Sequence, residues 1–363
     1  MISIFVLKID LLNKISKNFA SNLISWYSDN KRSLPWRDTK DPYKIWLSEI
    51  ILQQTQIKQG LPYYNKFVKL FPDVDSLSNS SEHKVLKNWE GLGYYSRARN
   101  LHKASQKVVK EYDSKFPKTY DELIKLPGIG DYSASAISSF SNNEIRPVLD
   151  GNVYRLISRL FEISITINTS NAVKEFKKVL FKLISKKYPG DFNQAIMDFG
   201  STVCRPKNPS CYDCIFNEDC LSYQNKTVLN FPVKKKNATV KFRTLNYLVV
   251  MDFDKKTLIK KREKKDIWQN LYNFPLIESV DKINGEIIIE FLESNYKSKF
   301  SFEKIYLDKT YNHKLSHQNL ELKFWIIRTL SPVEGGISIS NLNNYPFPKP
   351  LISYINTLER FLM

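Results

Sequence analysis

The chain has 363 residues, of which 42% are hydrophobic, and this content is typical of a folded protein rather than a disordered one. Its length suggests two domains, each large enough to bury a core. The formal net charge of +18 favours a polyanionic partner such as nucleic acid, although an AT-rich genome that favours lysine codons would give a similar surplus. No apolar run approaches the ~20 residues of a membrane span, and the apolar start at 2–7 lacks the features of a signal peptide.

The first half, up to about residue 224, has the pattern of a mostly helical domain. Asp41-Pro42 combines an N-cap residue with proline at the first helical position, which predicts a helix over 43–56. The stretch 119–122 has the capping-box pattern and predicts a helix that begins there and runs toward residue 126. In segment 152–161 the apolar side chains share one helical face: Val153, Leu156, Ile157 and Leu160.

A carboxyl group interrupts the apolar part of the first of these helices. Glu49 is followed directly by Ile50, Ile51 and Leu52, so we expect its side chain to be desolvated, which raises the pKa of a carboxyl group. A carboxylic acid that stays protonated near neutral pH is what general-acid catalysis requires. The alternative is a glutamate that faces solvent on an amphipathic helix, which would be the default for an isolated case.

Turn residues separate the later helices of this half. Gly128 and Gly130, in Leu-Pro-Gly-Ile-Gly, allow a tight backbone turn, and the amides that follow can bind a phosphate. An ordinary turn between two helices is the alternative interpretation. Asp150 stands just before the segment 152–161, where a carboxylate is most often an N-cap.

All four cysteines lie close together, in the spacing C-x6-C-x2-C-x5-C over 204–220. Thiolates clustered in this way can hold a tetrahedral metal ion or an iron–sulfur cluster. A four-thiolate zinc knuckle usually has two C-x2-C pairs, whereas this segment has one. No cysteine remains for a disulfide, which predicts a reducing compartment. Arg205 and Lys207, between the first two cysteines, could contact DNA phosphates or remain solvated surface charges.

The pattern changes after a polar, basic stretch at 225–241, which predicts an interdomain linker. Strands are predicted at 245–251 and 257–260, joined by a turn at 252–255, and a third strand at 322–330. The segments 286–296 and 351–362 have helical patterns. The second half is therefore predicted to be α+β.

Several long segments, in collinear order from about residue 20 to 224, resemble the signatures of MutY-type adenine DNA glycosylases of the endonuclease III superfamily. They are Leu34-Pro-Trp-Arg37, the segments 42–56 and 91–101, the glycine turn, Leu149-Asp-Gly-Asn-Val153 and the cysteines. The resemblance implies a mostly α helix-hairpin-helix glycosylase domain over 1–224, with the hairpin at about 119–140 and a [4Fe–4S] loop at 204–220. The segment 268–275 resembles one in the family's C-terminal α+β Nudix-like domain, here 242–363. No run resembles the acidic Nudix box, so nucleotide hydrolysis is not expected.

The resemblance also implies a function, the excision of adenine mispaired with 8-oxoguanine or guanine in double-stranded DNA during base excision repair. Glu49 would protonate the adenine, and Asp150 would stabilise or trap the resulting sugar cation. Tyr132 and Asn152 match positions that shape the family's pocket. Because Tyr132 stands where bifunctional endonuclease III-type enzymes have a Schiff-base lysine, a monofunctional enzyme is expected. We expect a monomer, in the bacterial cytoplasm and associated with the nucleoid, with no membrane partner.

The remaining matched positions are expected to hold DNA or a cofactor. The positions expected to contact DNA or the damaged pair are Arg37, Gln54, Thr55, Leu92, Gly93, Tyr94, Gly128, Gly130, Arg205 and Lys207. Ser316 and His317 match a Phe-Ser-His loop that meets 8-oxoguanine in the family, with Leu315 in place of the phenylalanine. One [4Fe–4S] cluster is expected on the four thiolates of Cys204, Cys211, Cys214 and Cys220.

Two other functions fit parts of this pattern. One is an endonuclease III-type glycosylase for oxidised pyrimidines, against which Tyr132 and the C-terminal half argue. The other is a non-catalytic protein that binds DNA lesions, against which the presence of both Glu49 and Asp150 argues.

Overall fold

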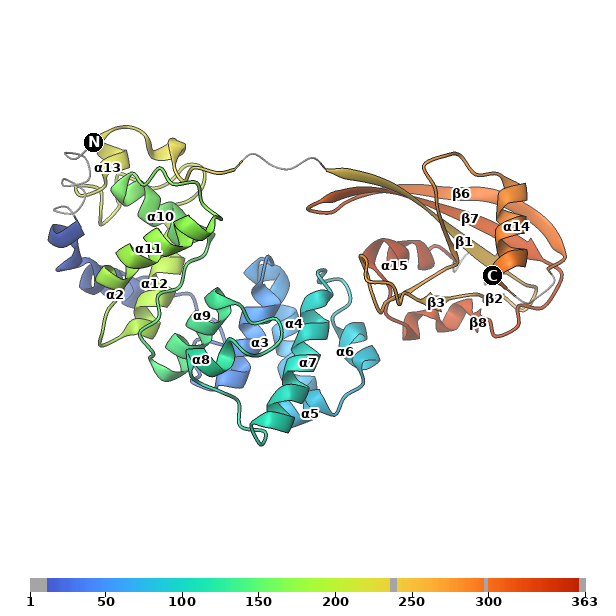
Figure 1. Cartoon of the computed structure of the whole chain (residues 1–363), viewed down its shortest axis with the longest axis horizontal. Helices are drawn as coiled ribbons and strands as arrows, with labels where there is room; N and C mark the ends of the chain where they lie inside the picture. Colours follow the sequence, from blue (N-terminus) through green and yellow to red (C-terminus); the bar gives the residue numbers. More distant parts are fainter. Residues whose placement is uncertain (1–11, 236–239, 297–299, 359–363) are drawn as a thin grey trace. The chain divides into compact units, whose positions relative to one another are not determined.

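The computed structural model describes residues 12–235, 240–296 and 300–358, which form two compact units (Figure 1). Unit 1 contains the described residues up to Asn79 and those from Lys103 to 235. Unit 2 contains Ser80–His102 and the described residues from 240 onward. A segment from the middle of the helical half therefore belongs to the same unit as the C-terminal part. The domain bounds 1–224, 225–241 and 242–363 stay predictions.

Unit 1 is built from helices. In chain order they are α2 (Phe19–Asn30), α3 (Pro42–Leu52), α4 (Ile57–Leu70), α5 (Val74–Ser78), the later part of α7 (Ser96–Glu111), α8 (Tyr120–Leu123), α9 (Asp131–Asn142), α10 (Gly151–Phe161), α11 (Ser170–Leu183), α12 (Pro189–Thr202), α13 (Leu221–Gln224) and the 3-10 turn η1 (Val228–Asn230). Helix α3 packs on α9, and α12 packs on α2, α9 and α10. The two helices that carry Glu49 and Tyr132 and the helix that Asp150 caps thus form one packed group.

Helix α3 begins where the sequence predicts. The Asp41 carboxylate accepts a hydrogen bond of 3.0 Å from the Tyr43 amide, and Pro42 occupies the first turn. The helix ends at Leu52 rather than at residue 56, so the predicted end is wrong. Gln54 has φ = 53°, a left-handed conformation that an α-helix of L-residues does not contain.

The glycine turn lies between α8 and α9, as predicted. Gly128 adopts φ = 78°, which a residue without a Cβ atom does at little cost. Helix α8 begins at Tyr120, but the predicted capping-box hydrogen bonds to the backbone are not formed. Instead, the Thr119 hydroxyl donates to the Glu122 carboxylate over 2.6 Å.

Unit 2 contains α6 (Glu82–Asn88), the first part of α7 and a mixed sheet with the strand order β6-β7-β1-β2-β8. The long strand β1 (Lys241–Met251) pairs in parallel with β7 (Gln318–Thr329), which pairs antiparallel with β6 (Phe302–Lys314). Strands β2 (Lys256–Thr257) and β8 (Ile337–Ser338) extend the sheet, and β5 (Leu276–Glu278) pairs with β1. A separate pair consists of β3 (Lys260–Lys261) and β4 (Tyr272–Asn273).

Both faces of this sheet are covered, because β1 alternates its side chains between two cores. Leu245, Tyr247 and Val249 belong to one core, with α15 (Lys349–Ile355) and the 3-10 segment η2 (Ile339–Asn344). Leu248 and Val250 belong to the other core, with α14 (Gly285–Asn295). The predicted α+β class of this half is confirmed.

The local predictions in unit 2 hold unequally. Strand 245–251 lies within β1, and helices 286–296 and 351–362 correspond to α14 and α15, although residues beyond 358 lie outside the described residues. The predicted strand 257–260 is wrong, because β2 ends at Thr257 and β3 pairs with a different strand. No helix in the described ranges is long and apolar enough to cross a membrane.

Candidate active site and cysteine loop

A cavity of about 780 Å³ in unit 1 brings together side chains from distant parts of the sequence. Glu49 of α3, Tyr132 of α9 and Asp150, which precedes α10, all line it. Further predicted residues on its wall are Arg37, Gln54, Thr55 and Asn152. All four residues predicted to be catalytic therefore face one space, which is large enough for a nucleobase and its sugar.

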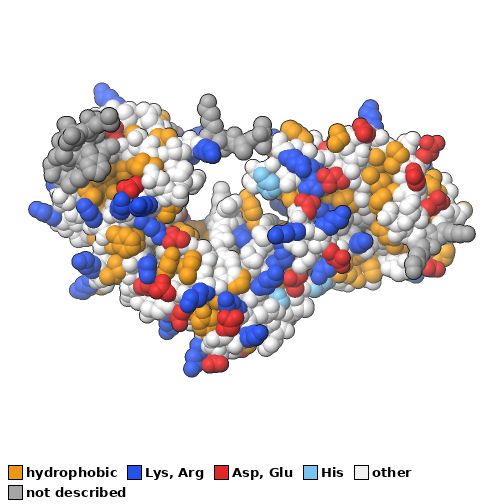
Figure 2. Space-filling model, in the orientation of Figure 1, with side chains coloured by type: hydrophobic (Ala, Val, Ile, Leu, Met, Phe, Trp, Pro, Cys, Tyr) orange, Lys and Arg blue, Asp and Glu red, His pale blue; other side chains and the backbone are white. Residues whose placement is uncertain are grey.

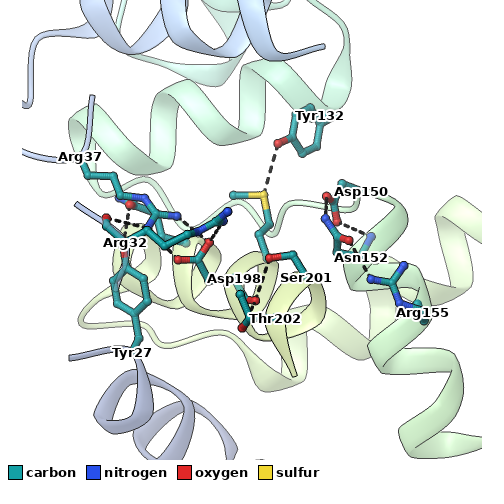
Figure 3. Close-up of polar contacts among 12 residues, drawn as sticks. Tyr27, Arg32, Arg37, Tyr132, Asp150, Asn152, Arg155, Asp198, Ser201 and Thr202 are labelled. Carbon is teal, nitrogen blue, oxygen red and sulfur yellow. Dashed lines mark hydrogen bonds and ion pairs between the residues drawn. The ribbon is translucent and has the colours of Figure 1, made fainter. Parts of the chain in front are cut away.

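The Glu49 carboxyl group is poised to carry a proton at neutral pH. Burial raises its pKa to about 7, and the nearby charge of Asp150 adds to the increase. A hydrogen bond with the Tyr132 hydroxyl and the more distant charge of Arg37 oppose it. The Tyr132 hydroxyl also lies 3.3 Å from the sulfur of Met197 (Figure 3). The expected desolvation of Glu49 is therefore present in the structure.

Asp150 is both a helix cap and a wall residue of the cavity. Its Oδ1 accepts the amides of Asn152 and Val153 at 2.9 and 2.8 Å, and its Oδ2 accepts the Asn152 side-chain amide at 2.8 Å (Figure 3). Burial raises the pKa of this carboxyl, while the same hydrogen bonds and the charge of Arg155 lower it. The N-cap interpretation and the placement beside Glu49 are thus compatible.

A buried ion-pair group forms another part of the cavity wall. Asp198 of α12 accepts two hydrogen bonds of 2.7 Å from Arg37, one on each carboxylate oxygen, and a further one from Arg32 (Figure 3). Burial raises the pKa of Asp198, but the two guanidinium groups lower it to below its usual value. Arg37 also lies over the ring of Tyr27. In this structure Arg37 shapes the cavity, and its predicted contact with DNA stays a prediction.

Two arginines of α10 that the sequence reasoning missed connect the cavity to the cysteine loop. Arg155 donates to the Asn152 side-chain oxygen at 2.8 Å and to the Cys204 carbonyl at 2.7 Å. Arg159, which is 2% exposed, donates to the Arg205 carbonyl at 2.8 Å and lies 3.4 Å from the Cys204 sulfur. Their signal in the sequence is two arginines four residues apart in a helix that is otherwise rich in apolar residues.

The four cysteines line one small cavity, whose wall also contains Leu156, Leu160, Val203 and Phe216. In the described part of the chain, no three His, Cys, Asp or Glu side chains converge on a point that could hold a single metal ion. Four thiols around a shared apolar space can supply the four thiolate ligands of a [4Fe–4S] cluster. The donors present therefore fit an iron–sulfur cluster. Arg205 and Lys207 of this loop are exposed.

A second cavity, of about 370 Å³, lies within unit 2 and contains five further residues that are predicted to contact DNA or the lesion. Leu92, Gly93 and Tyr94 line it together with Ser316 and His317. The turn that bears the first three has left-handed conformations at Gly91, Gly93 and Tyr94, with φ of 92°, 78° and 46°. Tyr94 is 45% exposed. Two groups of residues more than 200 positions apart in the sequence thus share one recess.

Comparison with known proteins identifies the family. Residues 47–182 match the model described as HhH-GPD superfamily base excision DNA repair protein, and 246–357 match the NUDIX domain. An adenine DNA glycosylase of Buchnera aphidicola subsp. Baizongia pistaciae is 35% identical over 355 residues, which cover 94% of this chain and 97% of that protein. The chain belongs to the adenine DNA glycosylase family. The mouse adenine DNA glycosylase is 38% identical over 215 residues, 57% of this chain and 42% of that protein.

Solved structures agree with this assignment at the level of the fold. A thermostable thymine-DNA glycosylase has a TM-score of 0.54 at 26% identity, covering 59% of this chain and 98% of that one. An endonuclease III in a non-covalent complex with DNA has a TM-score of 0.52 at 20% identity, covering 59% and 97%. The predictions of a helix-hairpin-helix glycosylase domain, a Nudix-like domain and adenine DNA glycosylase activity are confirmed, and this glycosylase is a DNA-binding enzyme of base excision repair.

Proposed function

We propose that this glycosylase excises adenine mispaired with 8-oxoguanine, or with guanine, from duplex DNA and leaves an abasic site. The observation that carries the proposal is that Glu49 and Asp150, more than 100 residues apart in the sequence, line one cavity. To reach this cavity the adenine must leave the base stack, at a cost of a few kcal/mol that a mispair reduces. The curated relatives, named adenine DNA glycosylases, support adenine as the excised base.

Glu49 is the general acid in this proposal. Its carboxyl group, with a pKa of about 7, donates a proton to a ring nitrogen of the extruded adenine, N7 by family likeness. Protonation makes adenine a better leaving group, so the bond between C1′ and N9 breaks and its electron pair stays on the base. Tyr132, which hydrogen-bonds Glu49, holds the carboxyl in place.

Asp150 acts on the sugar. Loss of the base leaves an oxocarbenium-like cation, and a carboxylate beside C1′ stabilises that charge or bonds to it reversibly. Asn152, whose amide donates to Asp150 over 2.8 Å, orients this carboxylate. A water molecule then adds to C1′ and gives up its proton, which completes the hydrolysis.

We propose that the enzyme is monofunctional. A phenol at position 132 cannot form the Schiff base through which lysine-bearing glycosylases cut the DNA backbone. Borohydride trapping on duplex DNA tests this point. We expect no strong covalent adduct, and a strong adduct would contradict the assignment.

The cysteine loop is proposed to hold one [4Fe–4S] cluster on Cys204, Cys211, Cys214 and Cys220. When bound, the cluster supplies a rigid cross-link, since glycosidic hydrolysis transfers no electron. Arg155 and Arg159 support the same loop through its backbone carbonyls, and exposed Arg205 and Lys207 are proposed to contact DNA phosphates. The protein is proposed to act as a monomer in the bacterial cytoplasm, at the nucleoid.

We propose that the second cavity binds and recognises the base opposite the adenine. Tyr94 and Leu92 would wedge between base pairs, while Ser316 and His317 would offer polar groups to 8-oxoguanine. Gln54 and Thr55, on the wall of the first cavity, would hold the damaged pair open from unit 1. The glycine turn with Gly128 and Gly130 would bind a backbone phosphate.

A base-release assay tests the proposed function. Duplexes containing adenine opposite 8-oxoguanine, adenine opposite guanine, or thymine glycol are incubated with the wild type and with Glu49→Gln. We expect free adenine from the first two duplexes, no release of thymine glycol, and loss of at least about 10²-fold in rate for the variant, because general acid–base catalysis contributes about that much or more.

The three candidate functions give different results in this assay. Release of thymine glycol by the wild type would favour the oxidised-pyrimidine glycosylase. Tight binding without release of any base would favour the non-catalytic protein. Full activity in Glu49→Gln, with adenine still released by the wild type, would remove Glu49 as the acid.

A further inference from the structure

The turn Gly91–Tyr94 is held from both sides by the main chain of one distant residue. Glu90, just before the turn, accepts the amide of Phe347 at 2.9 Å. Tyr95, just after the turn, donates its hydroxyl to the carbonyl of the same Phe347 at 3.2 Å. That hydroxyl also accepts the Gly91 amide at 3.3 Å, so the hydrogen bonds join both ends of the turn to one residue.

Neighbouring contacts fix this arrangement further. Lys87 donates to Glu90 at 2.7 Å and to the carbonyl of Tyr345 at 3.3 Å. Arg99, one turn of helix beyond Tyr95, donates to the Gln269 carbonyl at 2.8 Å. The Glu90 side chain is 17% exposed and Phe347 is 1% exposed, so water competes little for these hydrogen bonds.

The turn itself needs such support. Gly91, Gly93 and Tyr94 all adopt left-handed backbone conformations, and Tyr94 does so with a bulky side chain, at an energetic cost. Inside the turn, the Gly93 carbonyl accepts the Trp89 indole at 3.0 Å and the Arg97 guanidinium at 3.2 Å. A loop held in this way presents Tyr94 to the second cavity in one orientation.

We propose that Glu90 and Tyr95 are positioning residues for lesion recognition: through the Phe347 main chain, the Nudix-like domain sets the geometry of the turn that carries Leu92 and Tyr94. The inference rests on the proposed function, and it assigns a role to two side chains that do not line the catalytic cavity. The backbone amide and carbonyl of Phe347 are the anchor of the turn. Because both groups belong to the main chain, the identity of the side chain at 347 matters only for packing.

The test compares binding to two duplexes that differ only in the base opposite adenine. Dissociation constants are measured for a non-cleavable adenine analogue opposite 8-oxoguanine and opposite guanine. The variants are Tyr95→Phe, Glu90→Leu and Glu90→Gln, and Tyr345→Phe is the control that removes a tyrosine hydroxyl two residues before Phe347 in the sequence. Melting temperatures are recorded for each, and adenine release is measured separately at saturating enzyme.

Tyr95→Phe and Glu90→Leu each remove two hydrogen bonds near the turn. We expect each variant to reduce the preference for 8-oxoguanine over guanine about fivefold, which corresponds to one hydrogen bond of ordinary strength. Glu90→Gln, which keeps an acceptor for the Phe347 amide, should rescue most of the preference, and Tyr345→Phe should leave it unchanged. The rate at saturating enzyme should change little, because Glu49 and Asp150 are untouched.

Other results would overturn the inference. An unchanged preference in folded Tyr95→Phe and Glu90→Leu would show that the anchor does not position the turn. An equal loss of affinity for both duplexes would assign these residues a structural role only. A wild type that prefers 8-oxoguanine but releases no adenine would contradict the proposed function and leave this binding test intact, whereas a wild type without any preference would contradict the inference itself.

Discussion

At the scale of single residues, the two carboxyl groups of the cavity have different surroundings. Burial raises the pKa of both, but Asp150 accepts three hydrogen bonds that stabilise its charged form. Glu49 has a hydrogen bond with one phenol and lies near the charge of Asp150, which favours its protonated form. The environments therefore suit a protonated Glu49 beside an ionised Asp150, which is the pairing that acid-assisted glycosidic cleavage requires.

The first prediction concerns the pH dependence of adenine release. The protonated fraction of Glu49 falls as pH rises through about 7, so the single-turnover rate at saturating enzyme should fall on the alkaline side of that value. On the acidic side the rate should fall as Asp150 becomes protonated, at a pH above the usual value for an aspartate because its pKa is raised. A rate that stayed constant between pH 6 and about 9 would contradict the acid role of Glu49.

A second prediction concerns stability. The pKa of Glu49 is higher in the folded chain than its usual value of 4.5, so folding is favoured while the group is protonated and loses stability as pH rises from 4.5 through about 7. Glu49→Gln stays neutral, so it should gain stability relative to wild type as pH rises. The unfolding free energy of the variant minus that of wild type should be about 2 kcal/mol larger at pH 8 than at pH 4.5, a value reduced from the full pKa shift because the Glu49 side chain is partly exposed. Chemical denaturation at both pH values measures this, with the exposed Glu111→Gln as the control. Equal differences at both pH values would contradict the desolvation of Glu49.

At the scale of elements, the contact between α10 and α12 sets the geometry of the cavity. A Cβ atom on Gly200 of α12 would lie 2.8 Å from the Asn152 carbonyl oxygen and 2.9 Å from its Cβ. Only a residue without a side chain permits this approach, and Asn152 is the residue that donates to Asp150. The distance between the helices is therefore coupled to the position of Asp150.

Gly200→Ala tests this coupling. The added methyl group must push α10 away, which should cost about 1–3 kcal/mol of unfolding free energy and lower the rate of adenine release by displacing Asp150. Gly151→Ala, whose Cβ would meet no atom within 4 Å, is the control for stability. If Gly200→Ala retained wild-type stability and rate, the close packing would not matter for the cavity.

Sequence reasoning predicted those elements whose signal is local. The Asp41-Pro42 helix start and the alternation along β1 both depend on neighbouring residues, and both are present. Strand β6 was missed because it pairs only at the edge of the sheet and its lysines interrupt the apolar alternation. The end of α3 was misplaced because a left-handed residue leaves no mark in hydrophobic periodicity.

In the candidate site, too, the sequence predicted the residues that have a local signal and missed those that depend on tertiary contacts. Glu49, Asp150 and the cysteines could be selected from their local sequence and from the family resemblance, but their convergence depends on how α3, α9 and α10 pack. Arg155 and Arg159 were missed because their partners are mainly backbone carbonyls of the cysteine loop, which carry no sequence signal. The hydrogen bonds of Glu90 and Tyr95 to the Phe347 main chain could not be predicted either, because backbone amides and carbonyls carry no sequence signal.

At the scale of the whole molecule, the basic side chains on the drawn face are not gathered in one patch (Figure 2). Figure 2 shows lysine and arginine side chains over the drawn face of both units, with acidic side chains between them. The net charge of +18 therefore predicts general affinity for DNA, and only particular cations would add defined phosphate contacts. The exposed pair in the cysteine loop is the candidate for such contacts.

Salt dependence measures how many phosphates the loop contacts. Arg205→Ala and Lys207→Ala should each lower the slope of log affinity against log salt concentration by about 0.9, the value for one phosphate contact on duplex DNA. Lys178→Ala, which removes an exposed cation paired with Glu175 at 2.8 Å, is the control. Unchanged slopes in both loop variants would assign Arg205 and Lys207 to the solvated surface.

The central claim is that one extruded adenosine is held between Glu49 and Asp150. The most direct measurement is a crystal structure of this glycosylase with duplex DNA that carries a 2′-fluorinated, non-cleavable deoxyadenosine opposite 8-oxoguanine. We expect the adenine inside the unit 1 cavity, with a ring nitrogen within about 3.2 Å of a Glu49 oxygen and C1′ facing the Asp150 carboxylate. An adenine that remains stacked in the duplex, or that is bound away from these two carboxyl groups, would contradict the account.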